Sequence, residues 1–295
     1  MIIGATGMLG SSIYLTNTNH ELIGTYLGEK PNSSKIIKLD ITKEENVKKV
    51  INNYQPEAII NTAAITNVDL CEKNRKLAEN VHILGTKYLV AAAEECNSYF
   101  LYISTDSVFD GIKGNYNEKD KPRPLNVYAQ TKFEGEKETL KYQNSSVIRT
   151  NIYGYNWLNK ESIAEWIINT LKKEKKINLF RDVYFTPILV NNLSQALLEI
   201  VERKLKGIFH IAGAENVTKI NFGKKIAELW NLDEELIEPI SIYDLNLKAD
   251  RPLKPTLDIT KCQKILRTKL LNLEEGLKLF RKLADLGYLE RLRNL

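Results

Sequence analysis

A glycine-rich turn near the start of the chain constrains the fold more than any other feature. The short apolar run Met1-Ile2-Ile3 leads directly into glycines spaced as G-x-x-G-x-x-G. Such glycines allow a tight turn from strand to helix and a close approach of a diphosphate, to which the helix N-terminus offers N–H donors and positive dipole. The pattern therefore predicts a dinucleotide-binding loop whose cofactor-binding residues are Gly4, Thr6, Gly7, Met8, Leu9 and Gly10.

Apolar runs alternate with helical patterns through the first half of the chain. Strands are predicted at 21–26, 35–39, 57–61, 99–103 and 146–149, and the two longest helices at 75–96 and 128–142. Strands that alternate with helices in this way form parallel, doubly wound sheets. We therefore predict an α/β fold, with a Rossmann-type doubly wound parallel sheet and a smaller C-terminal substrate-binding lobe.

The length of the chain, 295 residues, is enough for two lobes. We expect residues 1–154 to form the dinucleotide-binding Rossmann domain, which also receives about 186–214. The substrate-binding lobe is expected to comprise 155–185 and 215–295. Its first residues are rich in aromatics and asparagines, and among them Tyr153 and Trp157 suit a sugar or nucleotide cleft. A loop packed on the core would explain these aromatics equally well.

Charge and cysteine usage exclude several classes of function. The 42 basic and 37 acidic residues are interspersed and give a net charge of only +5, which does not indicate nucleic acid or a membrane surface as a partner. Cys71, Cys96 and Cys262 are widely separated, so a reducing cytoplasm fits better than a disulfide framework. The chain has neither a signal peptide nor an apolar stretch approaching about 18 residues. The three histidines show no ligand spacing, so no metal site is expected.

Two further segments are expected to line the dinucleotide. Asp40-Ile41 follows the strand predicted at 35–39 and is a candidate contact for the edge of the adenine. Ala63 and Ala64 follow the strand predicted at 57–61. Their small side chains let the nicotinamide ribose and the phosphates pass close to the backbone.

The end of the second predicted strand bears on which dinucleotide binds. In NAD-binding Rossmann folds an acidic residue near this point takes the ribose hydroxyls. Here the residues from Thr25 to Leu27 offer no carboxylate, while Lys30 and Lys35 lie close by in sequence. A cation suits a 2′-phosphate, so NADP(H) is favoured over NAD(H). The alternative is that both lysines are merely solvated.

The candidate chemistry lies between residues 99 and 132. Thr105 follows the strand predicted at 99–103, and Tyr128 and Lys132 are four residues apart, on one face of a helix. A free phenol has a pKa of about 10, which a neighbouring ammonium lowers. With the Thr105 hydroxyl, the phenol would form a proton donor and an oxygen-binding pair suited to reducing a ketone. A Y-x-x-x-K pair by itself is weak evidence of a catalytic site. The dinucleotide-binding glycine turn in the same domain makes the catalytic interpretation stronger.

Several motifs occur together and in one order: Gly4-x-x-Gly7-x-x-Gly10, Asp40-Ile41, Asn61-x-Ala63-Ala64, Ser104-Thr-Asp-x-Val-Phe-Asp-Gly111 and Tyr128-x-x-x-Lys132. This combination resembles the extended short-chain dehydrogenase/reductase family. Within that family, the Ser104–Gly111 run and Arg251-Pro252 are similar to the dTDP-4-dehydrorhamnose reductases.

The resemblance implies that a nicotinamide hydride reduces the 4-keto group of a nucleotide-linked 6-deoxysugar. Tyr128 would be the proton donor, Lys132 would hold the nicotinamide ribose, and Thr105 would hydrogen-bond the ketone oxygen. A nucleotide sugar is thus the expected partner, with a homodimer as a possible assembly. The candidate substrate-binding residues are Ser104, Thr105, Asp106, Val108, Phe109, Tyr153, Trp157 and Arg251.

Two residues depart from the family pattern, and two alternative functions stay open. Ser107 stands where the family usually has tyrosine, and His82 where it usually has asparagine. Sugar 4,6-dehydratases need a second carboxylate after Asp106, which Ser107 does not supply, but an epimerase or another reductase of the family remains an alternative. The fold also resembles the regulatory β subunit of methionine adenosyltransferase, a non-enzymatic protein that keeps much of the same pattern.

Overall fold

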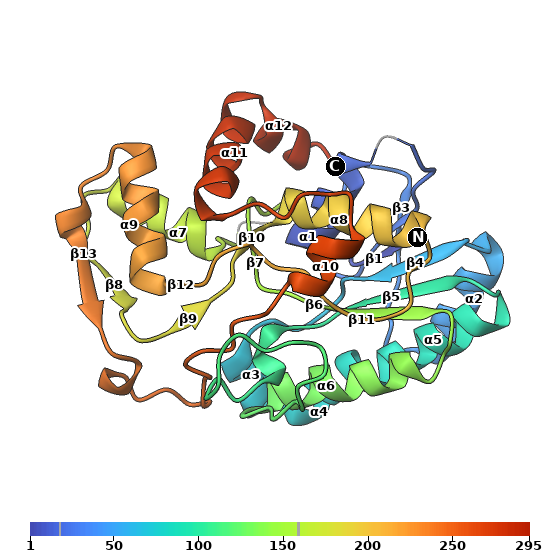
Figure 1. The fold of residues 1–295 in the computed structure, drawn as a ribbon. Helices are drawn as coiled ribbons and strands as arrows, with labels where there is room; N and C mark the ends of the chain where they lie inside the picture. The colour runs from blue at the N-terminus through green and yellow to red at the C-terminus, as the bar shows by residue number, and fades with distance from the viewer. Residues whose placement is uncertain (18, 158–159) are drawn as a thin grey trace.

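The computed structural model describes residues 1–17, 19–157 and 160–295. Its centre is a seven-stranded sheet in which every neighbouring pair is parallel, in the order β11-β6-β5-β4-β1-β2-β3 (Figure 1). The strands are β1 (Ile2–Ile3), β2 (Gly24–Tyr26), β3 (Ile36–Lys38), β4 (Ala58–Asn61), β5 (Tyr99–Ile103), β6 (Ser145–Arg149) and β11 (Gly207–His210). The predicted α/β fold class is confirmed.

Helices cover both faces of this sheet. In Figure 1, α1 and α8 lie above the sheet and α2, α5 and α6 lie below it. The helices of this part are α1 (Met8–Thr16), α2 (Glu44–Tyr54), α3 (Val68–Lys73), α4 (Arg75–Glu79), α5 (Gly85–Glu95), α6 (Val127–Leu140), α8 (Val190–Glu202) and α10 (Thr260–Ile265), with a 3₁₀ turn η2 at Asp106–Val108. One apolar cluster fills the space between the sheet and α1 and α8, and a second packs α2 and α5 against the other face.

The long helix predicted at 75–96 is present from Arg75 to Glu95, but its middle is wound as a π-helix. The wider turns of a π-helix, η1 (Asn80–Leu84), separate α4 from α5. Short π-segments inside helices commonly occur at functional sites. This one carries His82, whose ring is buried against α6. Apolar periodicity did not reveal the π-segment, because the helical run continues through it.

The C-terminal elements form their own apolar cluster beside the sheet (Figure 1). They are α7 (Ile163–Leu171), α9 (Lys219–Trp230), α11 (Leu273–Asp285) and α12 (Tyr288–Arg293), with the 3₁₀ turns η3 (Glu234–Leu236) and η4 (Ile242–Asp244). Three two-stranded ribbons accompany them: β7 (Ile152–Tyr153) with β10 (Ile188–Leu189), β9 (Tyr184–Phe185) with β12 (Val217–Thr218), and β8 (Ile177–Phe180) with β13 (Ile237–Ile240). None of the helices in the described ranges is long and apolar enough to cross a membrane.

The strand order locates the part of the sheet where a ligand is expected. Strands β2 and β3 extend the sheet on one side of β1, while β4, β5 and β6 extend it on the other. The order therefore reverses between β1 and β4. In open α/β sheets, ligands bind outside the carboxyl ends of the strands at such a reversal.

Candidate active site

The glycine turn lies at this reversal, directly against the end of β4. Gly4 has a φ of +81°, and a Cβ there would lie 3.1 Å from the backbone nitrogen of Ala63. The Thr62 hydroxyl donates to the carbonyl oxygen of Ile3 at 2.7 Å and so ties the two strand ends together. A Cβ on Gly10 would lie 2.2 Å from the carbonyl oxygen of Gly4. Glycine is therefore required at both positions, and the turn is as tight as the spacing predicted.

The N-terminus of α1 suits a diphosphate. Gly7 caps the helix, is exposed, and contributes no side-chain hydrogen bond to the first turn. Thr6 and Met8 are half-buried beside it. Free N–H groups at a helix start, next to glycines, form a ready anion site. Leu9 differs, because its side chain is buried in the core and only its backbone faces this region.

The other predicted dinucleotide contacts also lie at strand ends. The Asp40 carboxylate accepts from the backbone nitrogen and the hydroxyl of Thr42, at 2.9 and 2.7 Å, and closes the turn after β3. Ile41 is buried in the core, so the adenine-edge role of this pair stays a prediction. Ala63 and Ala64 are half-buried after β4.

The lysines expected near the 2′-phosphate are exposed. Lys30 and Lys35 both lie in the segment between β2 and β3, and Leu27 beside them is 52% exposed. Among the described residues no carboxylate forms an ion pair with either lysine. Both cations are thus available to an anionic ligand.

Tyr128 and Thr105 meet at the end of β5. The Thr105 side chain comes close enough to the Tyr128 phenol to affect its pKa, although 22 residues lie between the two in sequence. Asn126 caps α6 by accepting from the backbone nitrogen of Ala129 at 2.9 Å, which fixes where the first turn carries Tyr128. Thr105 is held from the other side, because its hydroxyl oxygen accepts from the Ser107 backbone nitrogen at 3.1 Å. The structure therefore brings the predicted phenol and alcohol together.

Lys132 lies one helical turn further along and is buried. Its Nζ donates to the carbonyl oxygen of Ile103 at 2.6 Å and lies 4.1 Å from the centre of the Tyr102 ring. Burial lowers the pKa of Lys132 to about 7, and the charge of Glu136 only partly offsets this. An ammonium in this position can exchange its proton near neutral pH.

The expected lowering of the Tyr128 pKa is not found. Burial instead raises the pKa of Tyr128 to about 12, despite the opposing hydrogen bond from Thr105, and the negative charge of Asp106 adds to the rise. The ammonium of Lys132 is directed at the Ile103 carbonyl. Desolvation thus outweighs the nearby charges, and Tyr128 holds its proton at neutral pH.

Asp106 is buried directly behind Thr105. One carboxylate oxygen accepts from the Asn151 amide at 2.6 Å, and the other accepts from the hydroxyls of Thr105 and Ser107, each at 3.2 Å. Burial raises the pKa of Asp106 despite these bonds and despite the positive charge of Lys219. Asp106 therefore orients Thr105, which is a narrower role than the substrate contact expected from sequence.

A buried ion pair supports the same strand end from below. Glu136 and Arg149 are joined at 2.7 Å and neither is more than 2% exposed. The hydroxyl of Ser104 donates to Glu136, so this predicted substrate contact is instead part of the support. Arg149 also donates to Nε2 of His210 at 3.3 Å. Sequence reasoning missed this network, because nothing in the spacing of Glu136, Arg149 and His210 indicates a common partner.

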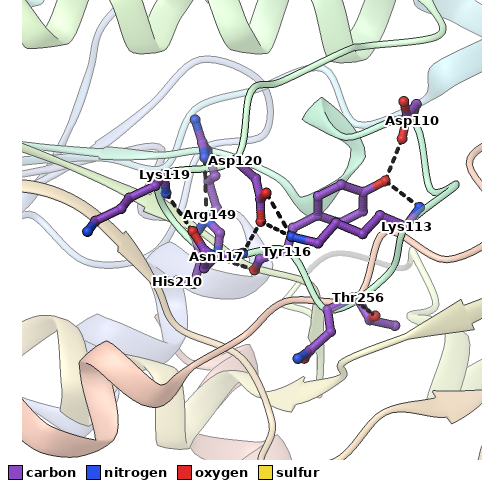
Figure 2. Close-up of polar contacts among 10 residues, drawn as sticks. Asp110, Lys113, Tyr116, Asn117, Lys119, Asp120, Arg149, His210 and Thr256 are labelled. Atoms are coloured by element: carbon purple, nitrogen blue, oxygen red, sulfur yellow. Dashed lines mark hydrogen bonds and ion pairs between the residues drawn. The ribbon is translucent and has the colours of Figure 1, made fainter.

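The loop that follows Thr105 is fixed through this network (Figure 2). His210 Nδ1 donates to the carbonyl oxygen of Tyr116 at 2.9 Å. The Tyr116 phenol donates to Asp110 and accepts from the Lys113 backbone nitrogen at 3.0 Å. Lys113 is further paired with Asp120 at 2.7 Å. These contacts hold the loop between β5 and α6 from Asp110 to Asp120.

Three of the predicted substrate contacts are core residues and are corrected here. Val108 and Phe109 are fully buried, and Phe109 stacks on Tyr116 with ring centres 4.2 Å apart. Tyr153 is 1% exposed and lies edge-on to Phe222 in the C-terminal cluster. These side chains follow polar site residues in sequence, but the turn η2 and the strand β7 direct them inward. We do not propose them as substrate contacts.

The remaining two predicted contacts are accessible. Trp157 is half-buried at the edge of the C-terminal cluster. Arg251 is half-buried and pairs with Asp69 at 3.3 Å. Among the described residues no group of three or more histidine, cysteine or acidic side chains is arranged to hold a metal ion.

The histidine on the π-helix contacts the catalytic helix. Nε2 of His82 accepts from the Ile65 backbone nitrogen at 3.0 Å, and Nδ1 lies 2.8 Å from the hydroxyl of Thr131. The His82 ring is also edge-on to Tyr128, with ring centres 5.8 Å apart. Burial lowers the pKa of His82 to about 3, and the charge of Lys132 contributes. His82 is therefore neutral and proton-bearing at Nδ1.

A seven-stranded parallel sheet with a glycine turn at its reversal and a Thr-Tyr-Lys group at the end of β5 defines the extended short-chain dehydrogenase/reductases. Residues 1–285 match the family model described as the RmlD substrate binding domain, and the chain belongs to that family.

Curated relatives of two kinds are similar over nearly the whole chain. A probable low-salt glycan biosynthesis reductase, Agl14, from Haloferax volcanii is 32% identical, over 94% of this chain and 95% of its own. A dTDP-4-dehydrorhamnose reductase from Aggregatibacter actinomycetemcomitans is 30% identical, over 97% of this chain and 99% of its own. Methionine adenosyltransferase 2 subunit beta from Xenopus laevis is also 30% identical, over 90% of this chain and 81% of its own.

Solved structures of reductases share the fold. A hypothetical dTDP-4-dehydrorhamnose reductase from Sulfolobus tokodaii is 33% identical with a TM-score of 0.83, and the match covers 92% of this chain and 97% of that one. A dTDP-4-dehydrorhamnose reductase from Bacillus anthracis in complex with NADP is 26% identical, also with a TM-score of 0.83, over 95% and 97% of the two chains.

Proposed function

We propose that the protein uses NADPH to reduce the 4-keto group of a nucleotide-linked 6-deoxysugar, as a dTDP-4-dehydrorhamnose reductase does. One observation carries the proposal: the hydroxyls of Tyr128 and Thr105 come together at the end of β5, one helical turn from buried Lys132. The two reductase relatives, which match this chain over nearly its full length, support the same reaction.

The side chains divide the chemistry between them. A bound nicotinamide supplies the hydride that reaches the carbonyl carbon. Tyr128 gives its proton to the carbonyl oxygen, and its pKa of about 12 keeps that proton in place until a more basic alkoxide develops. The Thr105 hydroxyl, which donates to Asp106 in this structure, would turn to donate its hydrogen bond to the same oxygen. Lys132, with a pKa of about 7, holds the nicotinamide ribose and exchanges protons at neutral pH.

The glycine turn would hold the diphosphate of the cofactor. The fit rests on the exposed start of α1 and on the close packing that glycine permits at positions 4 and 10. NADP(H) is favoured because Lys30 and Lys35 are exposed without a carboxylate partner among the described residues, and because a related reductase structure contains NADP.

We propose that the two lobes bind different ligands, with the boundaries that the sequence suggested. Residues 1–154 and about 186–214 would bind the dinucleotide, and 155–185 with 215–295 would bind the sugar nucleotide. The separate apolar cluster around Phe222 and Phe280 supports a distinct second lobe. Trp157 and Arg251, both half-buried, are the remaining candidates for substrate contacts. A homodimer and a cytoplasmic location stay predictions.

The direct test is an oxidation assay with purified protein and dTDP-4-keto-6-deoxyhexose. We expect absorbance of NADPH at its nicotinamide band to fall only when the keto sugar is present, and more slowly with NADH. If the keto sugar causes oxidation of neither NADPH nor NADH, the proposal is overturned. A preparation that carries tightly bound dinucleotide and interconverts sugars without net oxidation would favour an epimerase.

A regulatory subunit is the second candidate, because the Xenopus laevis relative is methionine adenosyltransferase 2 subunit beta. Binding to a methionine adenosyltransferase catalytic chain, together with no turnover of the keto sugar, would support that function. Turnover of the keto sugar without such binding would exclude it.

A further inference from the structure

Lys219, at the start of α9 in the C-terminal part of the fold, acts through its charge on Asp106 of the candidate active site. It is the first residue of α9, whose cap is the Thr218 hydroxyl, and its backbone nitrogen donates to the carbonyl oxygen of Val183 at 3.0 Å. The backbone of β12 is paired with β9 immediately before it. The backbone of Lys219 is therefore held both by α9 and by the ribbon of β12 and β9.

No acidic side chain among the described residues forms an ion pair with the Lys219 ammonium. Nζ lies 3.2 Å from the centre of the buried Phe185 ring. In the described part of the chain it has neither an ion pair nor a hydrogen-bond acceptor, and the nearest influence of opposite sign is the charge of Asp106. Burial lowers the pKa of Lys219 to about 8. A half-buried ammonium without an acidic partner can bind an anionic ligand.

Open space adjoins this ammonium. Lys219 lines a cavity of about 520 Å³ between α7, β8 and the segment after β13. The walls include Phe180 and the indole of Trp166, which is 40% exposed. On its other side Lys219 acts on Asp106, which orients Thr105. Lys219 thus lines the cavity and also acts on the carboxylate that orients Thr105.

We propose that Lys219 binds the diphosphate of the nucleotide-linked substrate and holds the sugar against Tyr128 and Thr105. This inference rests on the proposed function, since it assigns the anionic part of the same substrate. An ammonium on a diphosphate oxygen forms a charge-assisted hydrogen bond, which is stronger than a neutral one. Lys219 therefore favours nucleotide sugars over free sugars.

The test measures nucleotide binding separately from turnover. By calorimetry, Lys219→Met should weaken the binding of dTDP by about tenfold or more and leave the binding of thymidine unchanged. Lys219→Arg should stay close to the parent, because it keeps the charge. Lys224→Met is the matched control, since Lys224 is exposed on the same helix, and it should bind dTDP as the parent does. In turnover, Lys219→Met should raise KM for the keto sugar more than it lowers kcat.

Three outcomes would overturn the inference. One is an unchanged affinity of Lys219→Met for dTDP. A second is a fall in kcat with a shifted pH profile at unchanged dTDP affinity, which would mean that Lys219 only supports Asp106. The third is a parent protein that binds none of dTDP, UDP and GDP. A parent that binds dTDP through Lys219 but oxidises no NADPH would instead contradict the proposed reductase activity and leave the role of Lys219 standing.

Discussion

His82 and Thr131, 49 residues apart, are joined by a hydrogen bond of 2.8 Å between a ring nitrogen and a hydroxyl. The other ring nitrogen accepts from the Ile65 backbone, so the proton is at Nδ1 and is donated to Thr131. Thr131 in turn donates to the backbone of the first turn of α6. The loop after β4, which should pass the cofactor, is thereby tied to the helix that carries Tyr128 and Lys132.

Loss of this bridge should affect cofactor binding and turnover together. Each buried hydrogen-bonding group left without a partner costs about 1–3 kcal/mol, so we expect His82→Ala to weaken NADPH binding and lower kcat by about tenfold. His82→Gln, whose amide both accepts and donates, should recover most of the loss. Fluorescence titration with NADPH and steady-state kinetics measure both effects. A folded His82→Ala protein with the parent's affinity and kcat would show that His82 has no positioning role.

The same histidine should make stability depend on pH. Its pKa is about 3 in the folded protein and ordinarily 6.5, so the unfolded chain gains a proton first as the pH falls. Stability is therefore lost progressively from pH 6.5 downwards to 3, and at pH 5 the loss from His82 is about 2 kcal/mol. Urea unfolding at pH 7 and pH 5 should show a smaller acid-induced loss for His82→Gln than for the parent. Equal losses would contradict the buried, neutral histidine.

The ion pair between Glu136 and Arg149 should dominate the stability of this region. Removal of one partner leaves a buried charge without compensation, so Glu136→Ala should cost about 3–5 kcal/mol. Glu138 on the same helix forms an ion pair with Lys141 at 2.7 Å, but the lysine is 67% exposed. The matched variant Glu138→Ala should cost less than about 1 kcal/mol. Denaturant unfolding compares the two, and similar losses would refute the structural role of the buried pair.

The exposed lysines between β2 and β3 should determine cofactor preference. If Lys30 and Lys35 contact the 2′-phosphate, the double variant Lys30→Ala/Lys35→Ala should lower kcat/KM for NADPH by about tenfold and leave that for NADH nearly unchanged. Steady-state assays with both cofactors measure the ratio. If the double variant keeps the parent's ratio of kcat/KM for NADPH to kcat/KM for NADH, the two lysines are merely solvated.

The sequence predicted the sheet and the cofactor turn because both depend on local chemistry. Buried strands such as Tyr99–Ile103 are continuous apolar runs. Glycine at position 10 is required by contacts within the turn itself, and Gly4 has the positive φ that glycine favours. The Tyr128–Thr105 contact was also predictable, because a strand end and a helix start of known spacing approach the same edge of a parallel sheet.

What the sequence did not reveal depends on distant packing. The pKa of Tyr128 follows from how deeply the phenol is desolvated, which spacing to Lys132 does not report. His82, on the π-segment, contacts Thr131, which is 49 residues away and which no local pattern links to it. Phe109 was expected at the substrate from its place in the family motif, and Tyr153 because aromatic residues suit a sugar cleft. Both side chains instead pack inward on other aromatic rings.

The measurement that tests the central claim most directly compares Tyr128→Phe with the parent in a single turnover of NADPH and dTDP-4-keto-6-deoxyhexose. The variant lacks only the hydroxyl, so NADPH should bind as it does to the parent while the rate of nicotinamide oxidation falls by roughly 10²–10⁴. If Tyr128→Phe oxidises NADPH at the parental rate, the assignment of the Tyr128 phenol as the proton donor is contradicted.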